Sequence, residues 1–339
     1  MPESQTFSTV EYANISLPEK PCLAPWVSFV SLGDDRLQFR GSNFAFTLSH
    51  ALLIGAFLQV RDLLDGCHKV GEIASSGGEA YFPTTITFLL KMLRAHGVLH
   101  EFHPTFSSTE NYTEKRQVLF LSHLLQDPGH ANNAFVNSKL GLIGEGPLAE
   151  EIELSLTSIG INKLSRFTLD NWKNDPKIEK LEFIIACRES PSFSFFEEIN
   201  AKCLKAGIRW MHIALEGAMA YIGPTIVPYQ TACYKCLSTR VETLIPDLES
   251  HLAFKKEHNE RPQDEGYFSP LGRIISSHVA MELTRIFMGY SPPKTFGRYY
   301  KLDADDMVPS EHDVLRFPRC SACYNKKSPM DIWESTLAG

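Results

Sequence analysis

Four cysteines fall into two closely spaced pairs that could hold a metal ion. Cys233 and Cys236 form one CxxC pair, Cys320 and Cys323 form a second, and 83 residues (237–319) lie between the pairs. Four thiolates from two such pairs make a tetrahedral site of the type that binds zinc. A redox role would need one pair at a helix start beside a thioredoxin-like βαβ unit, and neither pair has that setting. A four-thiolate site leaves no open position, so we expect structural, non-catalytic zinc.

The other cysteines indicate a reducing compartment. Eight cysteines in 339 residues are too few for a disulfide scaffold. Cys22, Cys67, Cys187 and Cys203 stand in apolar surroundings and are expected to be buried packing residues. Residues 1–19 lack the pattern of a secretion signal, and no apolar run approaches the roughly 18 residues that span a bilayer. The sequence predicts a soluble cytoplasmic protein without a membrane segment.

A glycine-rich turn is the second candidate site. Gly144, Gly146 and Ala149 form a GxGxxA pattern after the apolar run 139–143, and Pro147 suits the first position of a helix. The pattern predicts a strand, a tight turn and a helix. The small residues could serve a nucleotide phosphate or only the packing of the helix on the strand. Glu145 places a carboxylate in the turn, where backbone N–H groups would otherwise hold a phosphate.

The connection after the next strand is short. Only ten residues, 171–180, separate Asp170 from the apolar strand that begins at Leu181. A helical crossover between parallel strands takes about a dozen residues or more. We therefore expect the helix that would complete a nucleotide site to be absent, the turn to be degenerate, and ATP not to be a cofactor.

Alternating strands and helices follow. Residues 181–187 read as a buried strand, Phe195 to Cys203 as a helix ended by Gly207, and residues 208–215 as another strand. This order predicts an α/β class with a Rossmann-like sheet and helices on its faces.

The first hundred residues predict a smaller domain. Residues 37–48 alternate as a β-hairpin, helical patterns follow at 52–66, 70–74 and 84–96, and residues 98–102 are extended. Thr84 is the expected cap of the third helix. Hairpin, three helices and strand are the order of a winged helix. We expect a winged-helix domain at 1–105, a linker at 106–135 with a loop from Pro128 to Asn137, and the α/β domain at 136–339.

A winged helix usually suggests DNA, but charge argues against it. The net charge is −7, and the third helix carries only Lys91 and Arg94 as cations, so no nucleic-acid partner is expected. The stretches Leu63–Ile73 and Leu89–Leu99 resemble the PqqD-like precursor-peptide recognition domain. The resemblance implies that a leader peptide adds as a strand beside the hairpin and is clasped by the third helix. The expected peptide contacts are Phe44, Phe46, Leu48, Phe88, Lys91 and Met92. The alternative, a wing that merely packs on the second domain, stays open.

A more specific resemblance involves the second domain. The stretches Tyr221–Pro228, Thr231–Leu237 and Arg316–Cys323 resemble the ThiF-like, ubiquitin-activating-enzyme-like proteins of thiazole/oxazole-modified microcin clusters. The resemblance implies that the protein binds the leader of a ribosomal precursor peptide and delivers it to a YcaO-type cyclodehydratase, which uses ATP to form azolines. Active adenylating relatives carry an Asn, Arg and Gln cluster after the position of Asp170 and an Asp after the next strand. Here residues 171–175 and Arg188-Glu189 depart from that pattern, which implies a non-catalytic scaffold.

Other functions remain open. An ATP-dependent peptide adenylyltransferase of the same superfamily is the main alternative, and a winged-helix transcription regulator is another. Residues 247–265 alternate in charge, which favours a solvated helix and loop, with a docking surface as the alternative. The sequence leaves open a homodimer and names neither the precursor peptide nor the product.

Overall fold

The computed structural model describes residues 12–33, 35–104, 112–260 and 264–324. The chain divides into two compact units, Met1–Asn133 (unit 1) and Ala134–Gly339 (unit 2), and each is considered by itself. Within the described ranges, no helix has the length and apolar character needed to cross a membrane.

A three-stranded antiparallel sheet forms one side of unit 1. Its strands are β2 (Ser28–Ser31), β3 (Leu37–Gly41) and β4 (Phe44–Leu48), in that order. Leu37 pairs with Leu48 and Phe39 with Phe46, so the predicted hairpin is confirmed. Strand β2 was not predicted. Because β3 is central, β4 forms one edge of this sheet.

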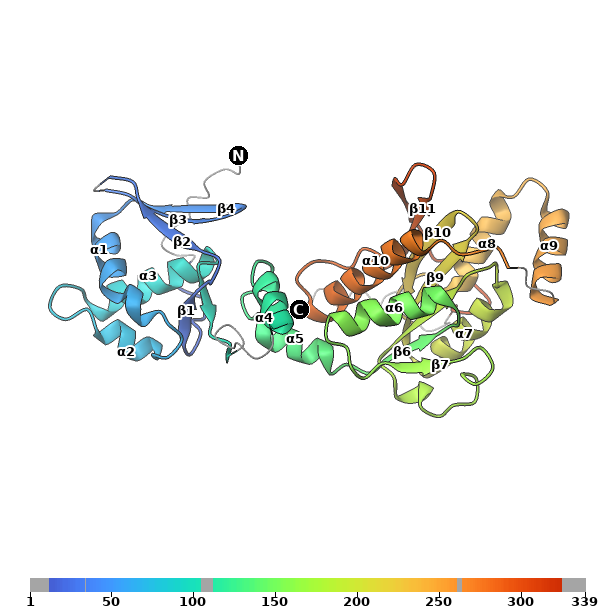
Figure 1. Cartoon of the computed structure of the whole chain (residues 1–339), viewed down its shortest axis with the longest axis horizontal. Helices are drawn as coiled ribbons and strands as arrows, with labels where there is room; N and C mark the ends of the chain where they lie inside the picture. Colours follow the sequence, from blue (N-terminus) through green and yellow to red (C-terminus); the bar gives the residue numbers. More distant parts are fainter. Residues whose placement is uncertain (1–11, 34, 105–111, 261–263, 325–339) are drawn as a thin grey trace. The chain divides into compact units, whose positions relative to one another are not determined.

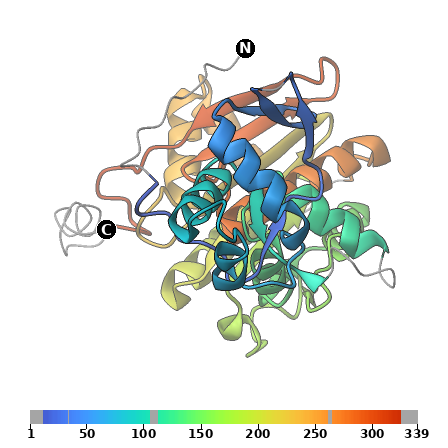
Figure 2. The ribbon, with the colours of Figure 1, turned by 90° about the vertical axis from the view of Figure 1, so that its left-hand side faces the viewer.

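Three helices lie together beneath this sheet (Figures 1 and 2). They are α1 (Ala51–Val60, extended by a 3-10 turn at Arg61–Leu63), α2 (Val70–Ser75) and α3 (Pro83–Ala95). Phe39 of β3, Phe57 of α1 and Leu89 of α3 are fully buried in one core. The expected cap at Thr84 is wrong: Phe82 is the N-cap and Pro83 the first helical residue, a position where proline costs no hydrogen bond.

The end of unit 1 differs from the expected loop. The extended segment forms β5 (Leu99–Glu101), which pairs with β1 (Pro21–Leu23) in a separate two-stranded sheet. Two helices follow, α4 (Tyr112–Leu121) and α5 (Pro128–Val136). The predicted loop from Pro128 to Asn137 is therefore wrong. Pro128 suits a first helical position, and Asp127 accepts the N–H of His130 on its carboxylate at 3.2 Å, as a helix cap does.

Unit 2 is built on a seven-stranded sheet with the order β12-β11-β10-β9-β8-β6-β7. Strands β6, β7, β8 and β9 are parallel, and β10, β11 and β12 run antiparallel to their neighbours. The bounds are β6 Leu140–Ile143, β7 Ser165–Phe167, β8 Phe183–Arg188, β9 Arg209–Glu216, β10 Met219–Ile226, β11 Arg298–Asp303 and β12 Pro309–Asp313. The α/β expectation is confirmed, whereas β11 and β12 were not foreseen.

Helices cover both faces of this sheet. Helices α6 (Pro147–Ser158) and α10 (Ser269–Met288) lie side by side (Figure 1), joined by a Ser155–Ser276 hydrogen bond of 2.9 Å. Phe183 of β8 contacts Phe287 of α10, whereas its neighbour Ile184 belongs to a core with α7 (Phe193–Ala206) and α8 (Tyr234–Leu244). Alternate residues of a strand face opposite sides, so α7 and α8 cover the other face. Helix α9 (Leu248–Glu260) lies in the charged run expected to be helix and loop.

The connection from β7 to β8 lacks an α-helix, as its length predicted. Residues 168–182, all of them described, form turns and one 3-10 turn at Ile178–Lys180. Trp172 is 2% exposed, and its ring meets Phe195 of α7 edge-on at 6.2 Å. Packing of Trp172 and Ile178 therefore fills the core beneath this short crossover.

Candidate functional site

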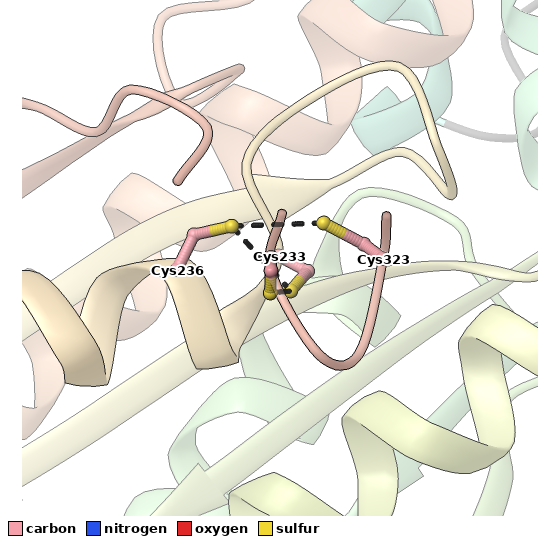
Figure 3. Close-up of side chains that lie close together, drawn as sticks. Cys233, Cys236 and Cys323 are labelled. Atoms are coloured by element: carbon pink, nitrogen blue, oxygen red, sulfur yellow. Dashed lines mark hydrogen bonds between the residues drawn. The ribbon is translucent and has the colours of Figure 1, made fainter. Parts of the chain in front are cut away.

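The four paired cysteines come together in unit 2. Cys233 is the N-cap of α8 and Cys236 lies in its first turn, while Cys320 and Cys323 lie in a turn after β12. The Sγ–Sγ distances are 3.8 Å for Cys233–Cys236 and Cys233–Cys320 and 3.6 Å for Cys236–Cys323. All four cysteines are buried, and their Sγ atoms lie within 4.8 Å of one another. Figure 3 shows Cys233, Cys236 and Cys323 of this cluster. A regular tetrahedron with metal–sulfur bonds of about 2.3 Å has edges of about 3.8 Å, so the cluster can hold a four-thiolate metal ion.

Backbone and arginine contacts support this cluster. The N–H of Phe317 donates to Cys236 Sγ at 3.3 Å. The Arg316 guanidinium donates to the carbonyls of Tyr229 at 2.8 Å and Cys323 at 3.0 Å. Hydrogen bonding between the cysteines lowers the pKa of Cys236 and raises the pKa of Cys233, so the cluster favours one thiolate and a metal ion would have to displace the remaining protons.

The remaining cysteines are not all buried. Cys22, Cys187 and Cys203 are buried, and burial raises the pKa of each thiol to about 12. The prediction is wrong for Cys67, which is exposed. Its N–H donates to Asp65 Oδ1 at 2.8 Å in a tight turn at the surface. The burial of Cys67 was expected because its surroundings in the sequence are apolar, and those surroundings did not predict the turn.

The glycine-rich turn lies between β6 and α6, as predicted. A side chain at Gly144 would meet Cys187 Sγ at 2.4 Å, and one at Gly146 would meet Glu189 Oε1 at 2.7 Å. Gly146 also has φ +83°, which other residues rarely adopt. Ala149 is fully buried in α6. The small residues thus permit close packing of this turn on the end of β8.

Two carboxylates, those of Glu189 and Glu145, lie at this turn. Glu189 Oε1 accepts the N–H of Leu148, in the first turn of α6, at 2.6 Å. Glu145 Oε1 accepts the N–H of Leu169 at 2.9 Å. Burial raises the pKa of Glu189, and the bond from Leu148 and the charge of Arg188 oppose that rise. A helix N-terminus attracts anions, and here the chain supplies one of its own.

The expected peptide contacts divide into core and surface residues. Leu48 and Met92 are 3% and 8% exposed and belong to the core of unit 1. Phe44, Phe46, Phe88 and Lys91 are half-buried. Phe46 of β4 stacks on His96, at the end of α3, with ring centroids 3.9 Å apart. We call the surface formed by Phe46, Phe88, Lys91 and His96 the β4–α3 surface.

Tyr12 and Ala13 lie against the β4–α3 surface, which the sequence analysis did not predict. The ring of Tyr12 meets Phe88 edge-on at 5.5 Å, and its hydroxyl lies 3.3 Å from His96 Nε2. Lys91 Nζ donates to the carbonyl of Ala13 at 2.7 Å. The apolar spacing of Tyr12, Ile15 and Leu17 was the available signal, but it is too short to predict a docked segment.

A cavity of about 140 Å³ in unit 2 was also missed. His212, Glu216, Tyr221 and Tyr234 are among its lining residues. His212 Nδ1 donates to the carbonyl of Gly223 at 2.9 Å, and burial lowers its pKa to about 4. Burial, with a smaller effect of the Glu265 charge, raises the pKa of Glu216 to about 7.

Solved structures with this arrangement share its fold at low sequence identity. A heterocyclase in complex with substrate and cofactor is 18% identical with a TM-score of 0.67, covering 90% of this chain and 39% of that chain. The heterocyclase TruD is 17% identical with a TM-score of 0.68, covering 90% and 43%. E. coli MccB is 16% identical with a TM-score of 0.63, covering 91% and 98%. This chain therefore spans about two fifths of each heterocyclase and nearly all of MccB.

Sequence comparison adds the family. No curated protein matches the chain in sequence. Residues 138–322, more than half of the chain, match the ThiF family. This range contains the glycine-rich turn, the shortened crossover and three of the four clustered cysteines. The chain belongs to the ThiF family.

Proposed function

We propose that the chain is a non-catalytic scaffold that binds the leader of a ribosomal precursor peptide and presents it to a separate YcaO-type, azoline-forming cyclodehydratase. Unit 2 is the ThiF-like part of this scaffold, and residues 1–105 are a winged-helix, PqqD-like recognition domain joined to it through residues 106–135. The shared fold with the heterocyclases and with MccB supports this proposal.

The contact between Glu189 and α6 carries the non-catalytic part of the proposal. A nucleotide bound as in dinucleotide-binding folds would place its phosphates on the N–H groups of this helix terminus. The Leu148 N–H is already bonded to the Glu189 carboxylate, which lies directly against Gly146. A triphosphate would have to displace one carboxylate and approach a second, that of Glu145. Desolvation and like-charge repulsion both oppose this.

Calorimetry with ATP and Mg²⁺ tests this part. We expect no binding at micromolar ATP by the wild-type chain. The double variant Glu145→Gln, Glu189→Gln should bind ATP more tightly than the wild type, because it removes both charges and keeps the side-chain shapes. Glu182→Gln, at an exposed position just before β8, is the matched control. Micromolar binding by the wild type would contradict the proposal.

Leader binding is proposed at the β4 edge. An edge strand offers unpaired N–H and C=O groups, so a leader can add as a further strand while apolar pockets select its side chains. The leader contacts that we propose are four half-buried residues, Phe44, Phe46, Phe88 and Lys91. Anisotropy of a labelled leader from the precursor gene nearest this chain's gene, measured with the full chain, tests the assignment.

Zinc is the metal that we propose for the cysteine cluster. Four thiolates at tetrahedral spacing suit zinc, and the site leaves no position for a reacting water. Zinc would attach the turn carrying Cys320 and Cys323 to the start of α8. We further propose a cytoplasmic location, which eight unpaired thiols support, and self-association as a homodimer, which light scattering tests.

ATP-dependent peptide adenylylation is the second candidate. A structure of E. coli MccB with ATP has the same fold with a TM-score of 0.59 at 15% identity, and the match covers 99% of that chain. ATP–pyrophosphate exchange by the purified chain would favour this candidate over the scaffold.

A further inference from the structure

Residues 12–17 lie on the surface that the proposed function assigns to the leader peptide. Tyr12 is 5% exposed and belongs to the core cluster of unit 1, and Ile15 and Leu17 are partly buried against it. The segment is therefore seated on unit 1 by its side chains.

The contacts of this segment resemble those of a bound peptide. Phe88 and Lys91, three positions apart, share one face of α3, and His96 is the residue that ends the helix. The ring of Tyr12 contacts the rings of Phe88 and His96. Lys91 bonds to a main-chain carbonyl, that of Ala13, and this contact does not depend on the side chain at position 13. The β4–α3 surface thus contacts an aromatic ring and the main-chain carbonyl of the next residue.

The segment leaves the edge of the sheet available. Among the residues that the structure describes, β4 pairs with β3 alone, and residues 12–17 contain no strand. A leader could therefore pair with β4, but its side chains would meet those of the segment on α3. A tethered competitor acts at an effective concentration of about millimolar. Such a competitor weakens the apparent affinity of any peptide that needs the same contacts.

We propose that residues 12–17 are an internal occupant of the β4–α3 surface, and that a leader peptide displaces them by placing its own aromatic side chain on Phe88 and His96 and a main-chain carbonyl on Lys91. This inference rests on the proposed leader-binding function. It specifies the chemistry of the leader and makes recognition depend on release of the segment.

The probe is a fluorescein-labelled synthetic peptide with the sequence of residues 12–19, titrated against the full chain. Tyr12→Ala should bind the probe at least about tenfold more tightly than the wild type, because losing an aromatic contact of about 1.4 kcal/mol or more frees the β4–α3 surface. Lys91→Met in the Tyr12→Ala background should weaken probe binding several-fold. Phe82→Ala, which truncates an exposed aromatic residue at the start of α3, is the matched control and should bind as the wild type does.

Equal affinity of the probe for the wild type and for folded Tyr12→Ala, or no binding to Tyr12→Ala, would overturn the inference. Thermal melting reports whether Tyr12→Ala is folded. If it is not, Tyr12→Phe keeps the ring and loses only the hydroxyl near His96, and a gain in probe affinity of a few-fold is expected, with no gain overturning the inference.

The precursor leader separates this inference from the proposed function. A leader that binds wild type and Tyr12→Ala equally would support leader recognition and overturn the internal occupant. A leader that binds neither protein, while the probe behaves as expected, would overturn leader recognition and leave the contacts of residues 12–17 with the β4–α3 surface supported.

Discussion

The carboxylate of Glu189, at the end of β8, accepts the N–H of Leu148 in the first turn of α6 at 2.6 Å. Forty-one positions separate the two residues in sequence. The bond joins the end of β8 to the start of α6, and it places a carboxylate at the positive end of a helix.

Replacing Glu189 should therefore destabilise unit 2. Glu189→Ala removes a charged cap of α6, and we expect a loss of about 1–2 kcal/mol in the free energy of unfolding. Urea denaturation at pH 7 measures it. Glu182→Ala, at an exposed position outside the turn, should change stability by less than about 0.5 kcal/mol. Equal effects of the two changes would show that the bond does not stabilise the helix.

Zinc should be present at one ion per chain. Cys320→Ser replaces a thiolate with a hydroxyl that cannot take its place, so the variant should lose zinc and melt at a lower temperature. Elemental analysis and thermal melting measure both effects. Cys67→Ser, an exposed thiol outside the cluster, should retain zinc and the wild-type melting temperature. Freshly purified, unchelated wild type without zinc would contradict the assignment.

Glu216 should make stability fall as pH rises. The pKa of Glu216 is about 7 in the folded protein and 4.5 in the unfolded chain, so the folded state binds the carboxyl proton more tightly than the unfolded state does. The free energy of unfolding therefore falls by about 3 kcal/mol between pH 4.5 and about 7, because one pKa unit corresponds to about 1.36 kcal/mol. Glu216→Gln removes this loss.

Denaturation of Glu216→Gln and wild type across pH tests the effect. The free energy of unfolding of the variant should exceed that of the wild type by up to about 3 kcal/mol at pH 8 and should differ little from it at pH 4.5. Glu265 also affects this group, and the tyrosines Tyr221 and Tyr234 line the same cavity. Glu182→Gln serves as the exposed control. A difference between variant and wild type that does not change with pH would contradict the prediction.

Leader binding should depend on backbone pairing. Proline introduced into the leader segment that pairs with β4 removes a ladder donor and should weaken binding about tenfold or more. Substitutions that keep the alternating apolar pattern should change affinity little, since pairing uses the main chain. Anisotropy with labelled leaders and the full chain measures both series. Proline tolerated at every position would exclude strand addition.

Local patterns in the sequence were sufficient for several features. The alternation of apolar residues in 37–48 predicted the hairpin, because the two-residue period of a strand depends only on neighbouring residues. The ten residues between Asp170 and Leu181 were too few for a crossover helix, and the structure has none there. The two CxxC pairs predicted the cysteine cluster because metal-ligand spacing is itself local.

Contacts between distant residues were decided only by the tertiary structure. Pairing of β1 with β5, the seating of Tyr12 on Phe88, and the bond from Leu148 to Glu189 each join segments more than 40 positions apart. Unlike the two CxxC pairs, which a shared metal site brings together, these segments carry no period or spacing that specifies the distant partner. That choice depends on how the helices and strands pack, and the same packing determined that Cys67 is exposed and that Glu189 fills the end of α6.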